Sequence, residues 1–448
     1  MLHNSESKSN YLIYFLFISS FALYILISYF TKREDSFILL PVYSCLFFIY
    51  LGIYRLIQST DHIKLALYFS IIFRVALLLL IPNLSDDFYR FIWDGRLINE
   101  GINPFVHLPN YYIENLTQAP EGITKELYDK LNSKEYFTIY PPVNQFVFML
   151  AALISPKSIL GSVLVMRVLI IAAEVGSIVL IGKLLGHYQL NPKNVLLYAL
   201  NPLVILELSG SLHFEAIAIF FLLLAVWAWE MRKKLGAAFY IALSICTKLI
   251  PLIFLPLFLT REKFKKVVFF YLIVGGTIVL LFVPLLNADF INGLTSSFSL
   301  YFQKFEFNAG IYYIIREIGY FVKGYNIIQT AGKYLALATF ISIITFTFFE
   351  GRKKHNLPTA FFWVYFLYLI FVTTLHPWYV VPLVAFSVFT NFRFPVLWSG
   401  LIFFTYLNYL NGSYHENLWV VGVEYIATFG FLIFELIKRL PGRKLKLV

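Results

Sequence analysis

Apolar runs long enough to cross a lipid bilayer recur along almost the whole chain, and they limit the possible folds more than any other feature. A spanning helix needs about 20 predominantly apolar residues, and 59% of the 448 residues are hydrophobic, with a mean hydropathy of +0.74. A transmembrane barrel would instead show alternating strands of about ten residues, which the sequence does not contain. The sequence therefore predicts an all-α polytopic membrane protein.

The apolar runs divide into segments of spanning length. The first run has no small-residue cleavage site behind it, so we expect it to be a retained helix. The chain has no fixed-period repeat and no low-complexity linker, which predicts one membrane domain over residues 1–448 with about 12–14 transmembrane helices. The expected full spans are 11–31, 36–57, 63–82, 160–185, 193–210, 213–231, 265–286, 325–349, 357–374, 377–391, 394–411 and 417–437.

The net charge of +11 is concentrated in short segments between the spans, which does not indicate a nucleic-acid partner. This is the positive-inside pattern of cytoplasmic loops, and such loops also attract anionic lipid. It places both termini in the cytoplasm and the long 83–159 loop, with nine acids against six Lys/Arg, on the outer face. The basic segments are "RKK" at 232–234, "REKFKK" at 261–266, "GRKKH" at 351–355 and "KRLPGRKLK" at 438–446.

Two segments do not fit single crossings. Residues 141–155, "PPVNQFVFMLAALIS", are short and begin with two prolines, so we expect a half-buried juxtamembrane helix on the outer face. Residues 235–259 have basic clusters at both ends and Lys248 in the middle. Two short helices meeting near Lys248 would keep both clusters inside, since irregular backbone is tolerated at membrane depth where protein covers it. Polar groups would then converge on the outer face, which also carries a second outer loop at 287–323.

The first outer loop begins with two adjacent acids, Asp86 and Asp87. A short interfacial helix over 86–98 would place Asp87, Arg90 and Asp94 on one face, at positions i, i+3 and i+7. Each acid taken alone could simply start this helix, because Asp is favoured at an N-cap and in the first turn. A carboxylate at the membrane boundary could also act as a base on a hydroxyl.

An ordered set of motifs carries a family resemblance over roughly residues 63–310. It consists of the acidic start of the loop, "DFYRFIWDGRLINEGINPF", "YPPVNQ", "NPLVILELSGSLHFEA" and "TKLIPLIFLP". This set resembles the integral-membrane GT-C glycosyltransferases, in particular the bacterial mannosyltransferases that use polyprenol-phosphate-mannose, and more distantly the catalytic subunits of the GPI-anchor mannosyltransferase I. The resemblance implies sugar transfer from a polyprenyl phosphate to a hydroxyl outside the cytoplasm, usually with inversion. It also implies that the essential acid is Asp86 or Asp87.

Such a transfer needs cations beside the lipid phosphate that leaves. Lys248, Arg90, Arg96 and Arg167 are the candidates near the outer half of the chain. For Lys248 the alternatives are a structural ion pair or a side chain that snorkels to the interface. Arg167 could instead pair with Glu174, two turns later on its helix.

The candidates for contact with the sugar or the acceptor are Asp94, Tyr140, His213, Glu215, Asn308 and His376. Three of them have a simpler interpretation: Asp94 could pair with Arg90 or Arg96, His213 could be a solvated loop residue, and His376 could belong to an aromatic interface belt. Two side chains, His213 and Glu215, do not make a metal site. Metal dependence stays open, since carboxylates near a phosphate could hold Mg²⁺ or Mn²⁺. The two cysteines lie in apolar runs and suggest neither a disulfide nor a metal site.

The sequence thus predicts a mannosyltransferase of a bacterial plasma membrane, whose partners are membrane lipids, a polyprenyl-phosphate-sugar donor and a glycolipid or glycan acceptor. A lipid-linked sugar flippase would share the basic inner loops, but transporters tend to show matching broken helices in two halves. A polysaccharide polymerase or ligase is the other alternative. Such enzymes usually place arginines and a histidine in a late loop, whereas the acids of this chain come early.

Overall fold

The computed structural model describes residues 2–115, 119–286, 290, 291, 293, 305–353, 355–412 and 414–439. Throughout these ranges the regular elements are helices, and one isolated bridge joins Phe307 to Thr374. The predicted all-α class is confirmed. Of the outer loop expected at 287–323, residues 287–289, 292 and 294–304 lie outside the described residues, as do residue 354 and residues 440–446 of the last two basic segments.

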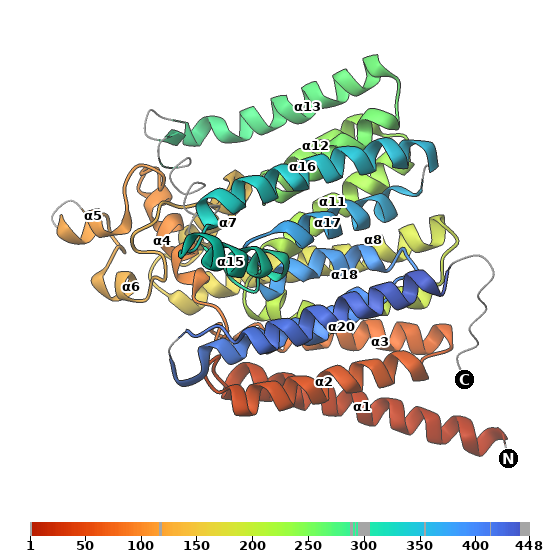
Figure 1. Cartoon of the computed structure of the whole chain (residues 1–448). Coiled ribbons are helices and arrows are strands. Elements are labelled where there is room, and N and C mark those ends of the chain that lie inside the picture. Colours follow the sequence, from red (N-terminus) through yellow and green to blue (C-terminus); the bar gives the residue numbers. More distant parts are fainter. Residues whose placement is uncertain are drawn as a thin grey trace.

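Six of the described helices are long and apolar enough to cross a membrane. They run roughly alongside one another in Figure 1, so the protein is a multi-pass membrane protein. These helices are α1 (Leu2–Phe30), α2 (Ser36–Leu56), α8 (Ile159–His187), α13 (Phe264–Phe282), α16 (Ile328–Lys353) and α20 (Leu418–Ile437).

The other expected spans are shorter or broken, so full-length helices are fewer than the 12–14 expected. Proline explains many of the breaks, because it lacks an N–H and fits best in the first turn of a helix. It occupies that turn in α10, α17, η6, α18 and α19. The shorter elements are α3 (Thr60–Val75), α10 (Pro202–Val204), η3 (Ile205–Gly210), α11 (Glu215–Glu230), α17 (Leu357–Phe371), η6 (Pro377–Val380), α18 (Val381–Ser387), α19 (Phe394–Leu401) and η7 (Ile402–Gly412).

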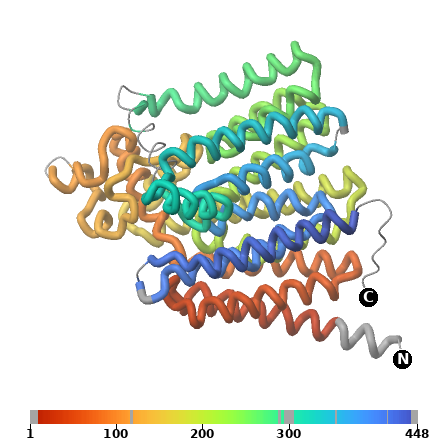
Figure 2. The backbone as a smooth tube through the Cα atoms, in the orientation of Figure 1, coloured from red at the N-terminus to blue at the C-terminus, as the bar shows by residue number. Residues whose placement is uncertain are grey.

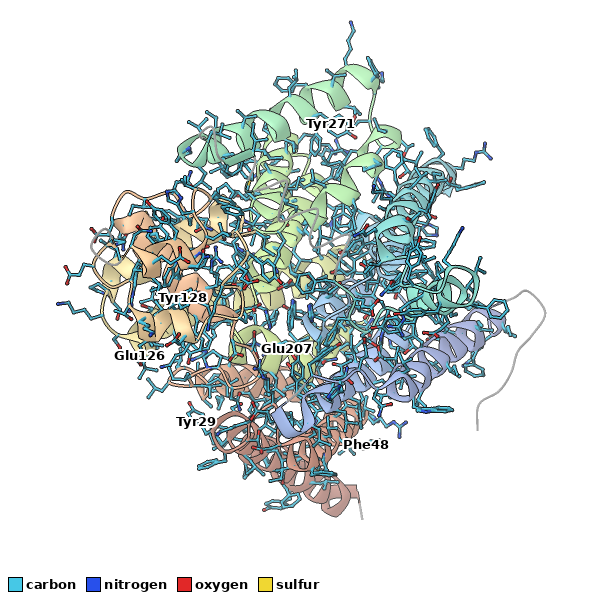
Figure 3. The ribbon with its side chains drawn as sticks, turned by 60° about the vertical axis from the view of Figure 1, so that its left-hand side comes forward. Tyr29, Phe48, Glu126, Tyr128, Glu207 and Tyr271 are labelled. Atoms are coloured by element: carbon cyan, nitrogen blue, oxygen red, sulfur yellow. The ribbon has the colours of Figure 1, made fainter. Side chains whose placement is uncertain are left out.

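The segment expected to span at 193–210 is instead a chain of short helical pieces in the middle of the protein. It begins with η2 (Pro192–Val195) and α9 (Leu196–Ala199) and continues through α10 and η3, after which the path bends by 111° into α11. Residues 194–219 are buried throughout, and Glu207 lies in the middle of the bundle in Figure 3. Irregular backbone is possible at this depth because protein surrounds it.

The predicted break near Lys248 is present. Helix α12 (Lys234–Ile245) and the 3-10 helix η4 (Ile250–Thr260) meet there. Their far ends come together, since Lys234 Nζ lies 3.4 Å from Glu262 Oε1. Both basic clusters are therefore at the same end of the molecule, as the charge pattern indicated.

The long loop after α3 forms a helical cap at one end of the bundle, and α1 begins and α20 ends at the opposite end (Figures 1 and 2). The predicted interfacial helices are present as α4 (Asp87–Asn99) and α7 (Pro142–Ile154), and α5 (Pro109–Glu114) and α6 (Lys125–Asp129) complete the cap. Helices α4 and α7 touch at Gly95, where an added Cβ would lie 2.1 Å from the carbonyl oxygen of Phe148. Within the range expected for the second outer loop, 287–323, the chain forms α15 (Gly310–Lys323).

Candidate active site

A cavity of about 360 Å³ lies where the cap meets the bundle. Five of the predicted site residues line it: Asp86, Asp87, Arg90, Tyr140 and His376. Much of the remaining wall is aromatic, and comprises Tyr136, Phe137, Phe305, Phe307, Trp378, Tyr406, Tyr409 and Tyr414. A polar end with two carboxylates and a broad aromatic wall are features of a small-molecule binding site.

Asp86 is held by a residue that the sequence analysis missed. Although it occupies the N-cap of α4, its side chain makes no cap hydrogen bond. It instead forms an ion pair with Arg33, with Nη2 and Oδ2 2.7 Å apart. The Arg33 guanidinium also lies over the ring of Tyr409, 5.1 Å from its centre. In the sequence, "TKRED" at 31–35 carries two cations and two acids between the first two expected spans, on the same outer face as the 83–159 loop, so Arg33 could have been considered as a partner for Asp86.

Asp87, the first residue of α4, has no such ion pair within the described residues. Its Oδ1 accepts a hydrogen bond from Asn132 Nδ2 at 2.8 Å, and its backbone N–H donates to Ser85 Oγ at 3.3 Å. Burial raises the pKa of Asp87, while the Asn132 hydrogen bond and the positive charge of Lys248 oppose this shift. A carboxylate with a raised pKa is a stronger base than one held by an arginine.

Arg90 and Asp94 form the support of the cavity wall. Arg90 Nε lies 2.8 Å from Asp94 Oδ1, and Nη1 donates to the backbone carbonyls of Ser133 and Tyr136, at 3.1 and 2.8 Å. Asp94 is fully buried and accepts a second hydrogen bond from Gln145 Nε2 at 3.0 Å. Asp94 therefore does not line the cavity, and it pairs with Arg90, as its simpler interpretation had it.

Arg96 and Arg167 are not at the cavity, which corrects their interpretation as phosphate ligands. Arg96 lies in the cap and donates to the carbonyl of Gly122 at 2.6 Å. Arg167 is fully buried, and its guanidinium donates to four backbone carbonyls, which leaves no free face for a substrate. These carbonyls belong to Leu78, Leu80, Ser209 and Gly210, so Arg167 ties the end of α3 to η3.

The pair between Arg167 and Glu174 that the sequence suggested as an alternative is not formed. The partner of Glu174 is Arg74 of α3, with Nε and Oε1 2.8 Å apart and both side chains fully buried. Ser209 also donates to Glu174. Two separate buried arginines, Arg74 and Arg167, therefore hold α3 against α8 and η3.

A second polar group lies behind the cavity and contains three predicted residues that do not line it, His213, Glu215 and Lys248. The ring of Trp378 is stacked between those of His213 and His376, with centroids 3.7 and 4.5 Å away. Lys248 Nζ lies 2.8 Å from Glu215 Oε1, so the ion-pair alternative for Lys248 is what the structure contains. This ammonium group is still close enough to Asp87 to lower the pKa of that carboxyl.

Glu207 connects the second group to the cavity wall. The hydroxyl of Tyr406, which lines the cavity, donates to Glu207 Oε1 at 2.9 Å. The other carboxylate oxygen lies 3.4 Å from His213 Nε2. Within the described part of the chain, no three His, Cys, Asp or Glu side chains gather closely enough to hold a metal ion.

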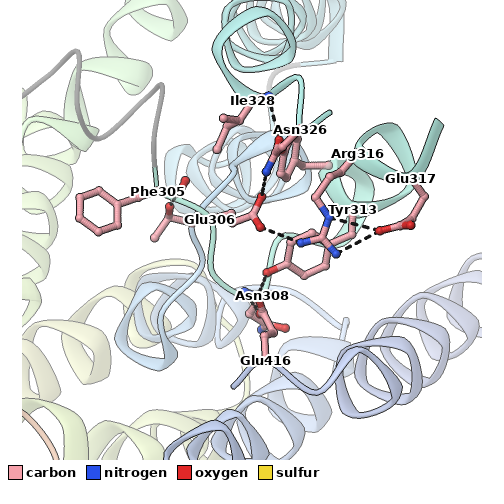
Figure 4. Close-up of polar contacts among 11 residues, drawn as sticks. Phe305, Glu306, Asn308, Tyr313, Arg316, Glu317, Asn326, Ile328 and Glu416 are labelled. Atoms are coloured by element: carbon pink, nitrogen blue, oxygen red, sulfur yellow. Dashed lines mark hydrogen bonds and ion pairs between the residues drawn. The ribbon is translucent and has the colours of Figure 1, made fainter. Parts of the chain in front are cut away.

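Asn308 is an anchor that lies off the cavity, which corrects its interpretation as a substrate contact. It is fully buried, its Nδ2 donates to both oxygens of Glu424 at 3.0 and 3.1 Å, and its backbone N–H donates to Glu416 at 2.6 Å. Its φ of +47° fits an asparagine better than most side chains. Asn308 thereby fixes the preceding segment to the start of α20 (Figure 4).

That segment brings a third carboxylate to the cavity, Glu306. Arg316 Nη1 lies 2.7 Å from Glu306 Oε1, and Asn326 Nδ2 donates to Oε2 at 3.1 Å (Figure 4). Asn308, the residue predicted from the sequence to contact substrate, is two positions from Glu306 in "FEFNAG". The neighbouring sequence does not show which of the two residues faces the cavity, because this depends on how the segment before α15 packs.

Residues 27–261, more than half of the chain, match the family model described as "Alpha-(1->6)-mannopyranosyltransferase, N-terminal domain". The matched range includes Arg33, the adjacent aspartates and Lys248. The cavity wall formed by η6, η7 and the segment before α15 lies beyond it. No curated protein matches the chain.

Proposed function

The chain belongs to the alpha-(1->6)-mannopyranosyltransferase family and is a membrane-embedded mannosyltransferase, and from this premise we propose that it takes mannose from a polyprenyl-phosphate-linked donor. The acceptor in this proposal is a hydroxyl of a glycolipid or glycan. The observation that carries the proposal is the unequal pair of aspartates at the cavity: Asp86 is neutralised by Arg33, whereas Asp87 has a raised pKa.

In the proposed reaction Asp87 is the general base. The acceptor hydroxyl gives its proton to the Asp87 carboxylate as its oxygen forms a bond to C1 of mannose. The bond between C1 and the phosphate oxygen breaks, and the electron pair leaves with the lipid phosphate. A single displacement of this kind inverts the configuration at C1, through an oxocarbenium-like transition state.

The leaving phosphate gains charge, and Arg33 is the cation best placed to stabilise it. Its side chain lines the cavity and is 29% exposed, so a guanidinium N–H remains available beside the Asp86 pair. Lys248 adds positive charge from behind the cavity but is partly neutralised by Glu215. Arg90 supports donor binding indirectly, because it holds the backbone of the cavity wall at Ser133 and Tyr136 in place. We therefore assign donor binding to Arg33 first and to Lys248 second.

The aromatic wall would hold the sugar. Tyr136 and Tyr414 of this wall contribute aromatic surface against which a sugar ring can pack, and Glu306 offers carboxylate oxygens for its hydroxyls. Because Arg316 and Asn326 fix Glu306, its orientation would not have to be set when substrate binds.

We place the cavity on the extracytoplasmic face of a bacterial plasma membrane. The basic segments at 232–234 and 261–266 lie at the opposite end of the bundle, and such segments mark the cytoplasmic side. A donor whose lipid tail lies in the outer leaflet would then have its phosphate at the depth of Asp87.

The test is transfer of radiolabelled mannose from a short-chain polyprenyl-phosphate-mannose to added acceptors in proteoliposomes. Wild type should transfer label, and Asp87→Asn should fold but lose turnover. Asp61→Asn is a matched control, because Asp61 is an exposed carboxylate far from the cavity. Repeating the assay with a chelator measures metal dependence.

Two outcomes would contradict the proposal. No transfer from mannose, glucose or arabinose donors, together with flux of lipid-linked sugar across the bilayer, would favour a flippase. Addition of whole lipid-linked glycans in one step would favour a polymerase or ligase.

A further inference from the structure

A second cavity, of about 460 Å³, lies at the end of the molecule opposite the proposed active site. It is formed where α11 ends and where α12 and α13 begin. Its floor is apolar and its rim is basic. The apolar residues include Trp229, Phe258, Phe269, Phe270 and Ile273, and the charged ones are Arg232, Lys234, Glu262, Lys265 and Lys266.

The rim carries more positive charge than its own carboxylate can neutralise. Lys234 is occupied, because its ammonium lies 3.4 Å from Glu262 Oε1 and 3.1 Å from the ring centre of Trp229. Arg232, Lys265 and Lys266 are exposed, and within the described residues none of them forms an ion pair. Three cations thus remain available to an anionic group.

The position of the cavity indicates that its occupant comes from the bilayer. Helix α13 forms the outer edge of the bundle (Figure 1), and only 17% of its spanning window is buried. Phe269, on the cavity wall, continues the exposed apolar surface of α13 that includes Leu272. A hydrocarbon chain lying against α13 would therefore run directly into the apolar floor.

Arg232 lies in the tight turn between α11 and α12. Arg232 follows the end of α11 with a φ of +58°, a conformation in which glycine is favoured. An arginine in this position is compatible with a binding role for its side chain at the rim.

We propose that this cavity binds one anionic phospholipid of the leaflet that faces the basic segments. Arg232, Lys265 and Lys266 hold the phosphate, and an acyl chain lies on Phe269 and Ile273. Basic pockets between membrane helices at this depth suit anionic lipid head groups. The proposal does not depend on the proposed reaction, since the two cavities lie at opposite ends.

Native mass spectrometry of the full-length protein in detergent tests this directly. We expect dioleoyl-phosphatidylglycerol to bind more tightly than dioleoyl-phosphatidylcholine. The double variant Lys265→Gln/Lys266→Gln should weaken the binding of phosphatidylglycerol by about tenfold or more. Raised salt should weaken this binding as well. The matched control is Arg55→Gln/Lys438→Gln, which removes two exposed charges at the same end but outside the cavity.

Three results would overturn the proposal: equal binding of the two lipids, an equal loss in the control variant, or displacement of phosphatidylglycerol by sn-glycerol 3-phosphate at similar concentration. The last would mean that the cavity takes a free phosphate without the lipid chains. Phe269→Ala provides a further measurement, since it should weaken the binding of phosphatidylglycerol and leave any binding of sn-glycerol 3-phosphate unchanged.

Discussion

Arg33 Nη2 lies 2.7 Å from Asp86 Oδ2, so the short connection between α1 and α2 reaches the start of α4. This ion pair makes two neighbouring acids unequal. Asp86 is charge-compensated, whereas the one side-chain partner of Asp87 among the described residues is a neutral amide, that of Asn132. The first three predictions below follow from this difference and from the proposed reaction.

Asp87→Asn should lower kcat by about 10²- to 10⁴-fold, the usual contribution of a positioned general base. Asp86→Asn should have a smaller effect on kcat, because it removes the partner of Arg33 and leaves the base in place. Mannose transfer under saturating donor, with folding checked by size-exclusion chromatography, separates the two variants. Equal losses, or a larger loss for Asp86→Asn, would move the role of base to Asp86.

The pH dependence of kcat/KM should show an acid limb set by Asp87. A base works only when deprotonated, so activity rises as pH rises through its pKa, and burial raises that pKa above the ordinary value of 3.8. Asn132→Ala removes a hydrogen bond that lowers the pKa of Asp87, so the limb should move to higher pH. A limb that stays in place in this variant, or moves to lower pH, argues against Asp87.

Arg33→Gln should raise KM for the donor and also lower kcat, because the cation beside the phosphate stabilises both the bound donor and the leaving group. Arg33→Lys keeps the charge but loses the planar fork, so it should recover only part of the activity. Steady-state kinetics at varied donor concentration measures this. If Arg33→Gln changes neither constant, the ion pair with Asp86 is structural alone.

Arg167→Met should destabilise the protein by about 3 kcal/mol or more, because it leaves several buried carbonyls without their donor. Its effect on turnover per folded molecule should be small, since Arg167 does not line the cavity. Thermal unfolding in detergent, beside mannose transfer, separates the two effects. Lys183→Met on the same helix is the control, because Lys183 is exposed.

Gly95→Ala should destabilise the cap, since its Cβ would lie 2.1 Å from the Phe148 carbonyl oxygen and force α4 away from α7. Overpacking of this kind costs about 1–3 kcal/mol or more, and the shift should also disturb Asp87 at the start of α4. Gly52→Ala in α2, where nothing lies within 4 Å of the new Cβ, should be neutral or slightly stabilising. Melting temperatures of the two variants test this difference, and equal melting temperatures would contradict the prediction.

The sequence by itself determined the features that depend on local composition. Apolar run length decides which segments enter a membrane, and charge distribution decides which ends lie together. The helix at 86–98, the short helix after "YPPV" and the break near Lys248 were predicted for the same reason. Each is encoded by neighbouring residues, such as the prolines at 141 and 142 and the lysine within an apolar run.

Only the tertiary structure decided which polar residues meet. Arg33 reaches Asp86 across more than 50 positions, and Glu306 enters the cavity because Asn308 is fixed by Glu416 and Glu424. Arg167 is a cation of the kind that binds phosphate, but its Nε, Nη1 and Nη2 all donate to carbonyls from the turn after α3 and from η3. A buried charge must find partners wherever the packing supplies them, and packing between distant segments leaves no local signature in the chain.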